Sequence, residues 1–313
     1  MATYFPNGRI ELSTLMARFD CEIKCREYLE SLRWPDGAAC PKCGHKEIAR
    51  VQGRESVLRC VECQNQFSVT AGTVFNDSHL PLAKWFIATF ILCQSKKGVS
   101  ALQIQRMLGI GGYKTAWHLC HRIRSAMIES QREKLTGTVE MDETYIGGKH
   151  KGYGKQRGME NKEIVVGIRQ RNGEVRFFHA KDAKSGTLAT YIRENISEDV
   201  DVIMTDEGVA YPDAMRRTGM KRHKTIQHKS RVYVRGDVHT NTIENAFSLL
   251  KRGIVGTWHK VSTKHLQSYL TEMEFRFNNR QSDTLFQDTL RHMIKAPVLT
   301  FEKLTNPKEQ AAA

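Results

Sequence analysis

The chain has 313 residues, of which 40% are hydrophobic, 26% charged and 8% aromatic. It can therefore bury a substantial core, in two or three domains at about 100–200 residues each, and is too apolar for general disorder. Its longest uncharged apolar run, Trp85 to Cys93, is far shorter than the roughly 20 residues that cross a bilayer, and no signal-peptide pattern opens the chain. We expect no membrane contact and a cytoplasmic protein.

The charge is strongly positive and unevenly distributed. The formal net charge is +14. Residues 1–80 are neutral overall, whereas residues 81–135 and 136–313 each carry a net charge of +7. The stretch from Ala214 to Gly236 holds eight Lys or Arg and no acid. Any single run of this kind is commonly just a solvated face, but separate runs in different parts of the chain favour nucleic acid as the partner.

Four of the eight cysteines form two C-x2-C pairs. The pairs Cys40/Cys43 and Cys60/Cys63 are separated by sixteen residues, and residues 48–51, 56–59 and 66–70 between and after them are expected to be strands. Two such turns can place four thiolates around one Zn²⁺ at about 2.3 Å. The pattern predicts a zinc ribbon in a reducing compartment, where disulfides are rare.

The other four cysteines are interpreted as core thiols. Cys21 and Cys25 are four residues apart on a helix expected over residues 13–32, and Cys93 and Cys120 lie in apolar helical stretches. Free cysteine behaves as a small buried hydrophobe in such positions.

A helix-turn-helix is predicted in the basic middle segment. A helix over residues 81–94 is followed by a short one over residues 100–108, a turn at Gly109, Gly111 and Gly112, and a second helix over residues 113–127. In this motif the second helix enters the major groove of DNA. The outward face of that helix is expected to offer Lys114, His118, His121, Arg122 and Arg124.

After residue 136 the pattern changes to that of an α/β domain. Strands are expected over residues 138–146, 163–170 and 174–180, then a helix over 185–195 and a strand over 200–205 that ends on Asp206. This order predicts a ribonuclease H-like fold, in which Asp142 on the first strand lies beside Asp206. Strand alternation sends Glu143 to the opposite face from Asp142.

The helix expected over residues 241–254 carries a polar and an apolar stripe. Asn241, Glu244, Ser248 and Lys251 fall on one side, and the side expected to pack on the sheet holds Ile243, Ala246, Phe247, Leu250 and Ile254. Glu244 could thus reach Asp142 and Asp206, with Lys251 two turns further to meet a phosphate. The alternative is that Asn241 is the N-cap and Glu244 the N3 residue of a capping box, which would make Glu244 structural.

Four segments resemble the catalytic blocks of a known family. They are Met141-Asp-Glu-Thr-Tyr-Ile-Gly-Gly-Lys149, Thr205-Asp-Glu-Gly-Val-Ala-Tyr211, His239-Thr-Asn-Thr-Ile-Glu-Asn-Ala-Phe-Ser-Leu-Leu-Lys251 and Tyr269-Leu-Thr-Glu-Met-Glu-Phe-Arg-Phe-Asn-Asn-Arg280. Together they are similar to DDE-type bacterial insertion-sequence transposases with an N-terminal zinc ribbon, the group related to eukaryotic Merlin elements. The resemblance extends from about Asp20 to Arg280. In that group the third catalytic residue is Asn or Glu, so Asn241 competes with Glu244 for this role.

The resemblance implies metal-dependent phosphoryl transfer on DNA. Asp142, Asp206 and the third residue would hold two Mg²⁺ (or Mn²⁺) ions. Water would attack when an element end is nicked, and a DNA 3′-hydroxyl when that end is joined to its target. Double-stranded DNA, as element ends and target, is the expected partner of a nucleoid-associated prokaryotic protein that acts as a homodimer or larger assembly. Residues expected to contact DNA, besides Lys114, His118, Arg122 and Arg124, are Lys149, Lys151, Lys155, Arg222, Lys224, Lys229 and Arg231.

These expectations give five segments. They are an N-terminal helical segment (1–33), a zinc ribbon (34–79), a helix-turn-helix domain (80–135), a ribonuclease H-like catalytic domain (136–300) and a tail (301–313). Two alternatives to a transposase remain: a nuclease or resolvase that uses the same site without joining strands, and a zinc-ribbon DNA-binding regulator in which the acids are turn and cap residues.

Overall fold

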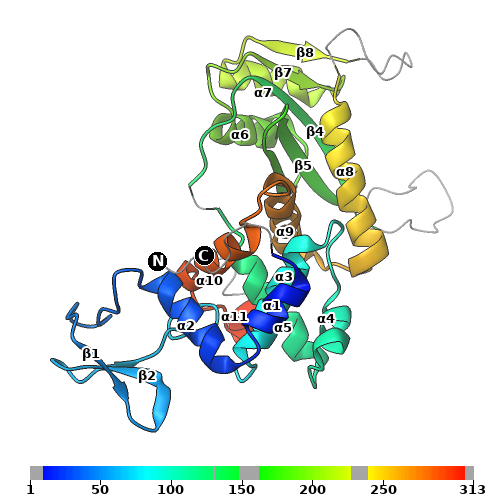
Figure 1. Ribbon diagram of the computed structural model, residues 1–313. Helices are drawn as coiled ribbons and strands as arrows, with labels where there is room; N and C mark the ends of the chain where they lie inside the picture. Colours follow the sequence, from blue (N-terminus) through cyan, green and yellow to red (C-terminus); the bar gives the residue numbers. More distant parts are fainter. Residues whose placement is uncertain (1–9, 130, 148–161, 227–238, 307–313) are drawn as a thin grey trace. The chain divides into compact units, whose positions relative to one another are not determined.

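The chain passes twice between two structural units, at Ile128/Glu129 and at Asn279/Arg280. Figure 1 presents the computed structural model, which describes residues 10–129, 131–147, 162–226 and 239–306. Unit 1 contains the residues up to Ile128 and those from Arg280 onward, and unit 2 contains Glu129–Asn279. Among the described residues, no helix is long and apolar enough to cross a membrane.

Unit 1 contains the three-stranded ribbon predicted around the paired cysteines. Its strands are β1 (Ile48–Val51), β2 (Arg54–Cys60) and β3 (Gln66–Phe67), and β2 pairs antiparallel with both neighbours. A small core of Cys40, Leu58, Cys60 and Phe67 is buried under Trp34, whose ring meets the Phe67 ring edge-on at 5.7 Å between centroids. So few apolar side chains make a weak core, which is why such ribbons depend on a metal for stability.

The rest of unit 1 is helical. Its helices are α1 (Leu12–Arg18), α2 (Glu22–Arg33), α3 (Leu82–Gln94), α4 (Ala101–Leu108), α5 (Tyr113–Ser125), α10 (Leu285–Lys295) and α11 (Phe301–Thr305). The three helices predicted between residues 81 and 127 are therefore all present. Ser100 caps α4, because its hydroxyl accepts the backbone N–H of Gln103 at 3.1 Å.

Two sequence-based expectations for unit 1 are wrong. Residues 280–300 were assigned to the catalytic domain, but Phe286 of α10 packs against Phe86 and Phe90 of α3 with ring centroids 6.0 and 6.2 Å apart, so this helix completes the core of unit 1. The helix expected over residues 13–32 is divided, and the break places Cys21 at the N-cap of α2. Cys21 is consequently exposed, whereas Cys25, Cys93 and Cys120 are buried as expected.

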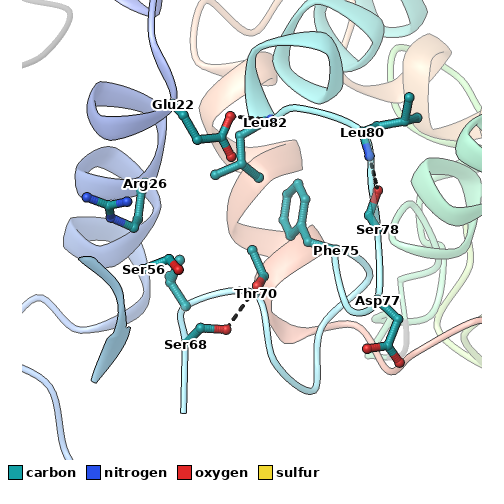
Figure 2. A pocket seen from close by; sticks show the side chains of 11 residues that line it. Glu22, Arg26, Ser56, Ser68, Thr70, Phe75, Asp77, Ser78, Leu80 and Leu82 are labelled. Carbon is teal, nitrogen blue, oxygen red and sulfur yellow. Dashed lines mark hydrogen bonds between the residues drawn. The ribbon is translucent and has the colours of Figure 1, made fainter. Parts of the chain in front are cut away.

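The segment between the ribbon and α3 is held by polar side chains (Figure 2). The carboxylate of Glu22 accepts the backbone N–H of Leu82 at 2.9 Å, and the hydroxyls of Ser68 and Thr70 lie 3.0 Å apart. With Arg26 and Phe75 these residues line a small pocket within unit 1. The hydrogen bond between Glu22 and Leu82 ties the start of α3 to α2.

Unit 2 is built on a mixed five-stranded sheet in the order β6-β5-β4-β7-β8. The strands are β4 (Thr138–Ile146), β5 (Glu163–Gln170), β6 (Val175–Ala180), β7 (Val202–Thr205) and β8 (His223–Thr225). The first three are antiparallel neighbours, while β7 lies parallel to β4 and to β8. The register of the parallel β4–β7 pair sets the end of β7 beside the middle of β4.

Helices cover both faces of this sheet (Figure 1). On one face, α6 (Ser185–Asn195) and α7 (Ala210–Thr218) bury Val139 and Met141 of β4. On the other, α8 (Asn241–Gly253) and α9 (Leu266–Asn278) bury Val165 of β5 and Phe177 of β6. The apolar stripe predicted for this helix (Ile243, Ala246, Phe247, Leu250 and Ile254) is buried in full, and its polar stripe is exposed.

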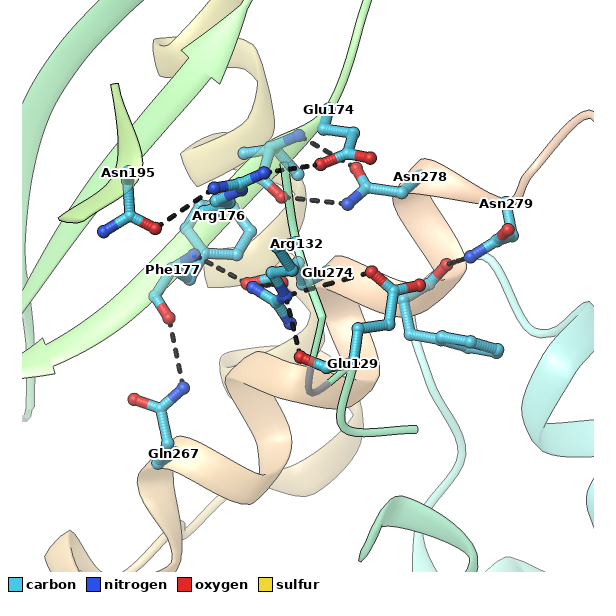
Figure 3. Close-up of polar contacts among 12 residues, drawn as sticks. Glu129, Arg132, Glu174, Arg176, Phe177, Asn195, Gln267, Glu274, Asn278 and Asn279 are labelled. Atoms are coloured by element: carbon cyan, nitrogen blue, oxygen red, sulfur yellow. Dashed lines mark hydrogen bonds and ion pairs between the residues drawn. The ribbon is translucent and has the colours of Figure 1, made fainter. Parts of the chain in front are cut away.

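Side chains of α9 form hydrogen bonds with backbone groups of β6, which is an edge strand of the sheet (Figure 3). Asn278 both accepts the N–H of Val175, at 2.9 Å, and donates to its carbonyl, at 3.0 Å. The carboxylate of Glu274 accepts the N–H of Phe177 at 2.8 Å and forms an ion pair with Arg132 at 2.5 Å. These contacts pair an edge strand that would otherwise expose its backbone groups, and they tie the residues before β4 to the last helix of unit 2.

The N-terminus of α8 is bound by a fully buried carboxylate of β4. Glu140 Oε2 accepts hydrogen bonds from the backbone N–H groups of Thr242 and Ile243, at 2.9 and 3.0 Å, and from the Thr242 hydroxyl at 2.8 Å. Its Oε1 accepts from Arg171 Nε at 2.7 Å. A carboxylate is favoured here because free N–H groups and the helix dipole make a helix N-terminus electropositive.

We predict that Glu140→Gln lowers the free energy of unfolding of unit 2 by about 2–4 kcal/mol, because the amide removes the buried charge opposite Arg171 and the helix N-terminus. Urea denaturation followed by circular dichroism measures this change. Glu194→Gln, at an exposed position of α6, is the control and is expected to change stability by less than about 0.5 kcal/mol. Equal stability of the two variants would show that Glu140 does not anchor α8.

Candidate active site and metal centre

The four paired cysteines meet as predicted. All four Sγ atoms lie within 4.8 Å of one another, with Cys40 and Cys63 separated by 3.5 Å and Cys43 and Cys60 by 3.6 Å. A tetrahedron with Zn–S bonds of about 2.3 Å has edges of about 3.8 Å, so these spacings fit a bound zinc. None of the eight cysteines forms a disulfide, and the cluster suggests a structural Zn²⁺ site.

The second constellation lies where β4 and β7 run side by side. The register pairs Glu140 with Met204, and continuing it by two residues sets Asp142 opposite Asp206. Paired residues of parallel strands point to the same face, here the face covered by α8, because Glu140 on that face binds the α8 N-terminus. Sequence order alone suggested this proximity of Asp142 and Asp206.

The electrostatics agree with this arrangement. Burial and the charge of the adjacent Glu143 raise the pKa of Asp142 to about 7. The charges of Asp206 and Glu244 contribute to the same shift. Three chain segments therefore place negative charge around one partly buried carboxyl group.

Close packing brings Glu244 to this group. Gly167 of β5 is the register partner of Asp142, and a Cβ at this position would lie 2.6 Å from Phe247 and 2.8 Å from Ile243. Only glycine lets α8 approach the sheet so closely at this point. The exposed Glu244 then extends from the first turns of the helix, and its Oε1 accepts a hydrogen bond from the Thr240 hydroxyl at 2.9 Å.

The predicted capping box does not form. The N-cap of α8 is Thr240, Asn241 is the first helical residue, and Glu244 lies one position beyond N3. The N–H groups that a capping side chain would bind are instead bound by Glu140. Asn241 and Lys251 are exposed on the same stripe as Glu244, so Asn241 remains a candidate for the third catalytic position.

Glu143 lies on the opposite face of β4, as strand alternation predicted. Its Oε2 accepts the hydroxyl of Tyr211 at 2.6 Å, and Tyr211 belongs to the core beneath α6 and α7. Burial raises the pKa of Glu143, with Asp206 adding to the shift, while the Tyr211 hydrogen bond opposes it. No sequence pattern predicts the roles of Tyr211 and Glu140. The position of Glu140 two residues before Asp142 is the one signal that these two acids share a face.

The donor set of this site fits a hard divalent cation. One oxygen of each acid is held locally: Asp142 accepts the N–H of Glu143 at 2.8 Å, and Asp206 that of Gly208 at 2.9 Å. Mutually repelling carboxylates in a buried position favour either proton uptake or cation binding. Asp142, Asp206 and Glu244 are the residues that would hold the cation.

The predicted DNA-binding face of α5 is largely wrong. Arg122 and Arg124 are 6% and 2% exposed; Arg122 stacks on Trp85 at 5.0 Å and donates to the carbonyl of Asn76. His121 is also buried. An amphipathic pattern does not distinguish an Arg exposed to solvent from an Arg whose N–H groups bind other groups inside the protein.

The other predicted DNA contacts differ in their surroundings. His118 is half-buried and bonded to the carbonyl of Leu299 at 2.8 Å, whereas Lys114 is exposed on the first turn of α5, and Arg222 and Lys224 are exposed near β8. Lys149, Lys151, Lys155, Lys229 and Arg231 lie outside the described residues.

Comparison with known proteins supports the transposase resemblance. Residues 134–278 match the family described as the ISXO2-like transposase domain, and residues 21–66 match the transposase zinc-ribbon domain. A Halobacterium salinarum protein, named as an uncharacterized protein in transposable element ISH50, is 28% identical over 275 residues that cover 82% of this chain and 91% of the relative. The chain belongs to the IS1595/ISXO2-like DDE transposases with an N-terminal zinc ribbon.

Membership of the IS1595/ISXO2-like family identifies the protein as a DNA transposase, and therefore as an enzyme that binds DNA. The transposase-domain match begins just before β4 and ends at the last residue of α9, so it coincides closely with unit 2. Residues 67–133, which include α4 and α5, lie between the two matches.

We predict one Zn²⁺ per chain of this transposase and its loss in Cys60→Ser, since a hydroxyl does not replace a buried thiolate ligand. Elemental analysis of protein purified under reducing conditions measures the metal. Cys21→Ser, at an exposed cysteine outside the cluster, is expected to retain it. Chelation should also unfold the ribbon, because structural zinc contributes on the order of 10–16 kcal/mol to small domains. Zinc-free wild-type protein with an intact ribbon would contradict the prediction.

Proposed function

We propose that this transposase binds the terminal inverted repeats of its own element, cleaves the DNA at the element ends and joins those ends to target DNA. The support is the convergence of Asp142, Asp206 and Glu244 from β4, the end of β7 and α8. The mixed sheet with β4 in the centre and helices on both faces is consistent with the ribonuclease H-like fold expected from the order of the elements.

The side chains have separate roles in this proposal. Asp142, Asp206 and Glu244 would hold Mg²⁺ or Mn²⁺, which would lower the pKa of the attacking water or 3′-hydroxyl and stabilise charge on the transferring phosphate. Glu140 positions Glu244 by holding the N-terminus of α8, and Tyr211 positions Glu143 beside the site. Lys251, seven residues after Glu244 and thus about 10 Å further along the helix, binds a DNA phosphate.

Element ends are read by unit 1 in this proposal. α4 and α5 have the order of a helix-turn-helix, and the exposed N-terminal turn of α5, including Lys114, is the part that such motifs present to base edges. Two ends are brought together by a homodimer or a larger assembly on DNA. A protein with this substrate acts at the prokaryotic nucleoid, in the cytoplasm.

Two other functions predict different products. A nuclease or resolvase that uses the same acids would cut DNA without yielding joined target molecules, and a zinc-ribbon regulator would bind DNA without cutting it. The raised pKa of the partly buried Asp142, to which other acids contribute, favours an enzyme, because cap residues do not require acids from several segments to lie near one another. Incubation with element ends, a target plasmid and Mg²⁺, followed by detection of joined molecules, separates the three functions.

We predict that Asp142→Asn or Asp206→Asn lowers DNA cleavage and strand transfer by several orders of magnitude while DNA binding is retained or strengthened, because each change removes a metal-binding charge that also repels phosphate. Product yield on labelled element ends and affinity in a gel-shift assay measure the two effects. Full activity in Asp142→Asn would exclude the proposed mechanism.

The third position is resolved by a pair of variants. Glu244→Gln should be inactive at an unchanged melting temperature, because Gln can still accept the Thr240 hydrogen bond but coordinates Mg²⁺ poorly. Asn241→Ala serves as the comparison and is expected to retain activity. The reverse result, with Glu244→Gln active and Asn241→Ala inactive but stable, would assign the role to Asn241.

A further inference from the structure

A second charged surface lies at the far end of α8. From Asn245 to Thr271 the chain carries four Lys or Arg and no Asp or Glu. After Lys251, exposed positions of this stretch include Arg252, His259 and Lys260, which we call the α8 basic arc. Val255, which lies between Arg252 and His259, is 74% exposed. Apolar packing therefore does not explain the exposure of this part of the chain.

The backbone of the arc has two uncommon features. α8 continues directly into a π-helical turn over Ile254–Trp258, and His259 then adopts φ 58° and ψ −61°. The N–H of Lys260 donates to the carbonyl of Trp258 at 2.7 Å. This hydrogen bond closes a γ-turn of the rare type with positive φ, which is strained. Such strain persists only where the surroundings hold it, and it is concentrated at binding and catalytic sites.

Buried anchors on either side hold the turn. Ile254 and Trp258 belong to the core beneath α8 and α9, and the Trp258 ring lies 4.9 Å from that of Tyr269. Thr263 donates to Glu163 at 2.6 Å, and Glu163 is also paired with His179 at 2.7 Å. This nearby acid is thus already engaged, and the arc retains its positive charge.

A structural explanation accounts for only part of this charge. Cations in the last turn of a helix stabilise its dipole, which explains Lys251 and Arg252. It does not explain Lys260, which follows the π-helical turn, nor the absence of acids over the whole stretch. A ligand with repeated negative charge fits all of these observations.

We propose that the α8 basic arc binds the phosphate backbone of duplex DNA. Arg252 lies eight residues beyond Glu244, about 12 Å along the helix. At about 3.4 Å of axial rise per phosphate in one strand, the arc contacts the backbone some three to four base pairs from the phosphate that reacts beside the carboxylates. This inference rests on the proposed function, because it assigns the path of DNA leaving that site.

The test measures the salt dependence of binding by the full-length, zinc-loaded protein to a 30-base-pair duplex of arbitrary sequence, without divalent metal. The slope of log affinity against log salt is negative, and each lost phosphate contact reduces its magnitude by about 0.9. Arg252→Ala/Lys260→Ala should therefore make the slope less negative by about 1.8. The matched control is Lys184→Ala/Arg193→Ala, two exposed cations at α6 on the opposite face of the sheet, which should leave it unchanged.

Thermal melting of both double variants provides the folding control, and all four substituted side chains are exposed. If the arc variant retains the wild-type slope, or changes it no more than the control does, the inference is wrong while the proposed function stands. If the wild-type protein fails to bind the duplex, the proposed function fails together with the inference.

Discussion

The arrangement of unit 2 depends on one buried carboxylate that faces a helix N-terminus. Glu140 is 0% exposed and accepts hydrogen bonds from two backbone N–H groups and a hydroxyl at the start of α8, as well as from Arg171. Burying an ionised group is costly unless its charge is compensated, and here the helix N-terminus and a guanidinium supply the compensation. Because Asp142 follows Glu140 by two residues, the same strand that fixes the helix also carries the first catalytic candidate.

This anchor explains how acids distant in the sequence come to share one environment. β4 and β7 run parallel, and their register sets Asp206, directly after the end of β7, beside Asp142 in the middle of β4. Gly167 lets α8 lie close to the sheet beside Asp142. The first turns of this helix carry Glu244, whose charge contributes to the raised pKa of Asp142. Burial raises the pKa of Asp142, and the repulsion among these acids adds to the shift. A bound divalent cation would relieve this repulsion, which links the folding of this region to the chemistry of a DDE transposase.

The features predicted correctly from sequence are those encoded locally. Cysteine spacing specifies the ribbon, and 3.6-residue periodicity specifies the buried face of α8. The errors involve partners distant in the sequence: the burial of Arg122 depends on Trp85 and Asn76, and α10 packs on α3 across nearly two hundred residues. The N-terminus of α8 was misassigned for a related reason, since its cap comes from a strand about a hundred residues earlier. A local pattern such as Asn241-Thr-Ile-Glu244 contains no information about such a partner.

The central claim is that three separate segments surround one metal site, and iron-directed cleavage of the protein tests it directly. Fe²⁺ substituted for Mg²⁺ generates hydroxyl radicals that cut the backbone close to where the metal is bound. The account predicts cuts near Asp142, near Asp206 and at the start of α8, all suppressed by excess Mg²⁺. It also predicts that Glu140→Gln weakens the cut at α8 more than the other two. Cuts at Asp142 and Asp206 with none at α8 would contradict the account.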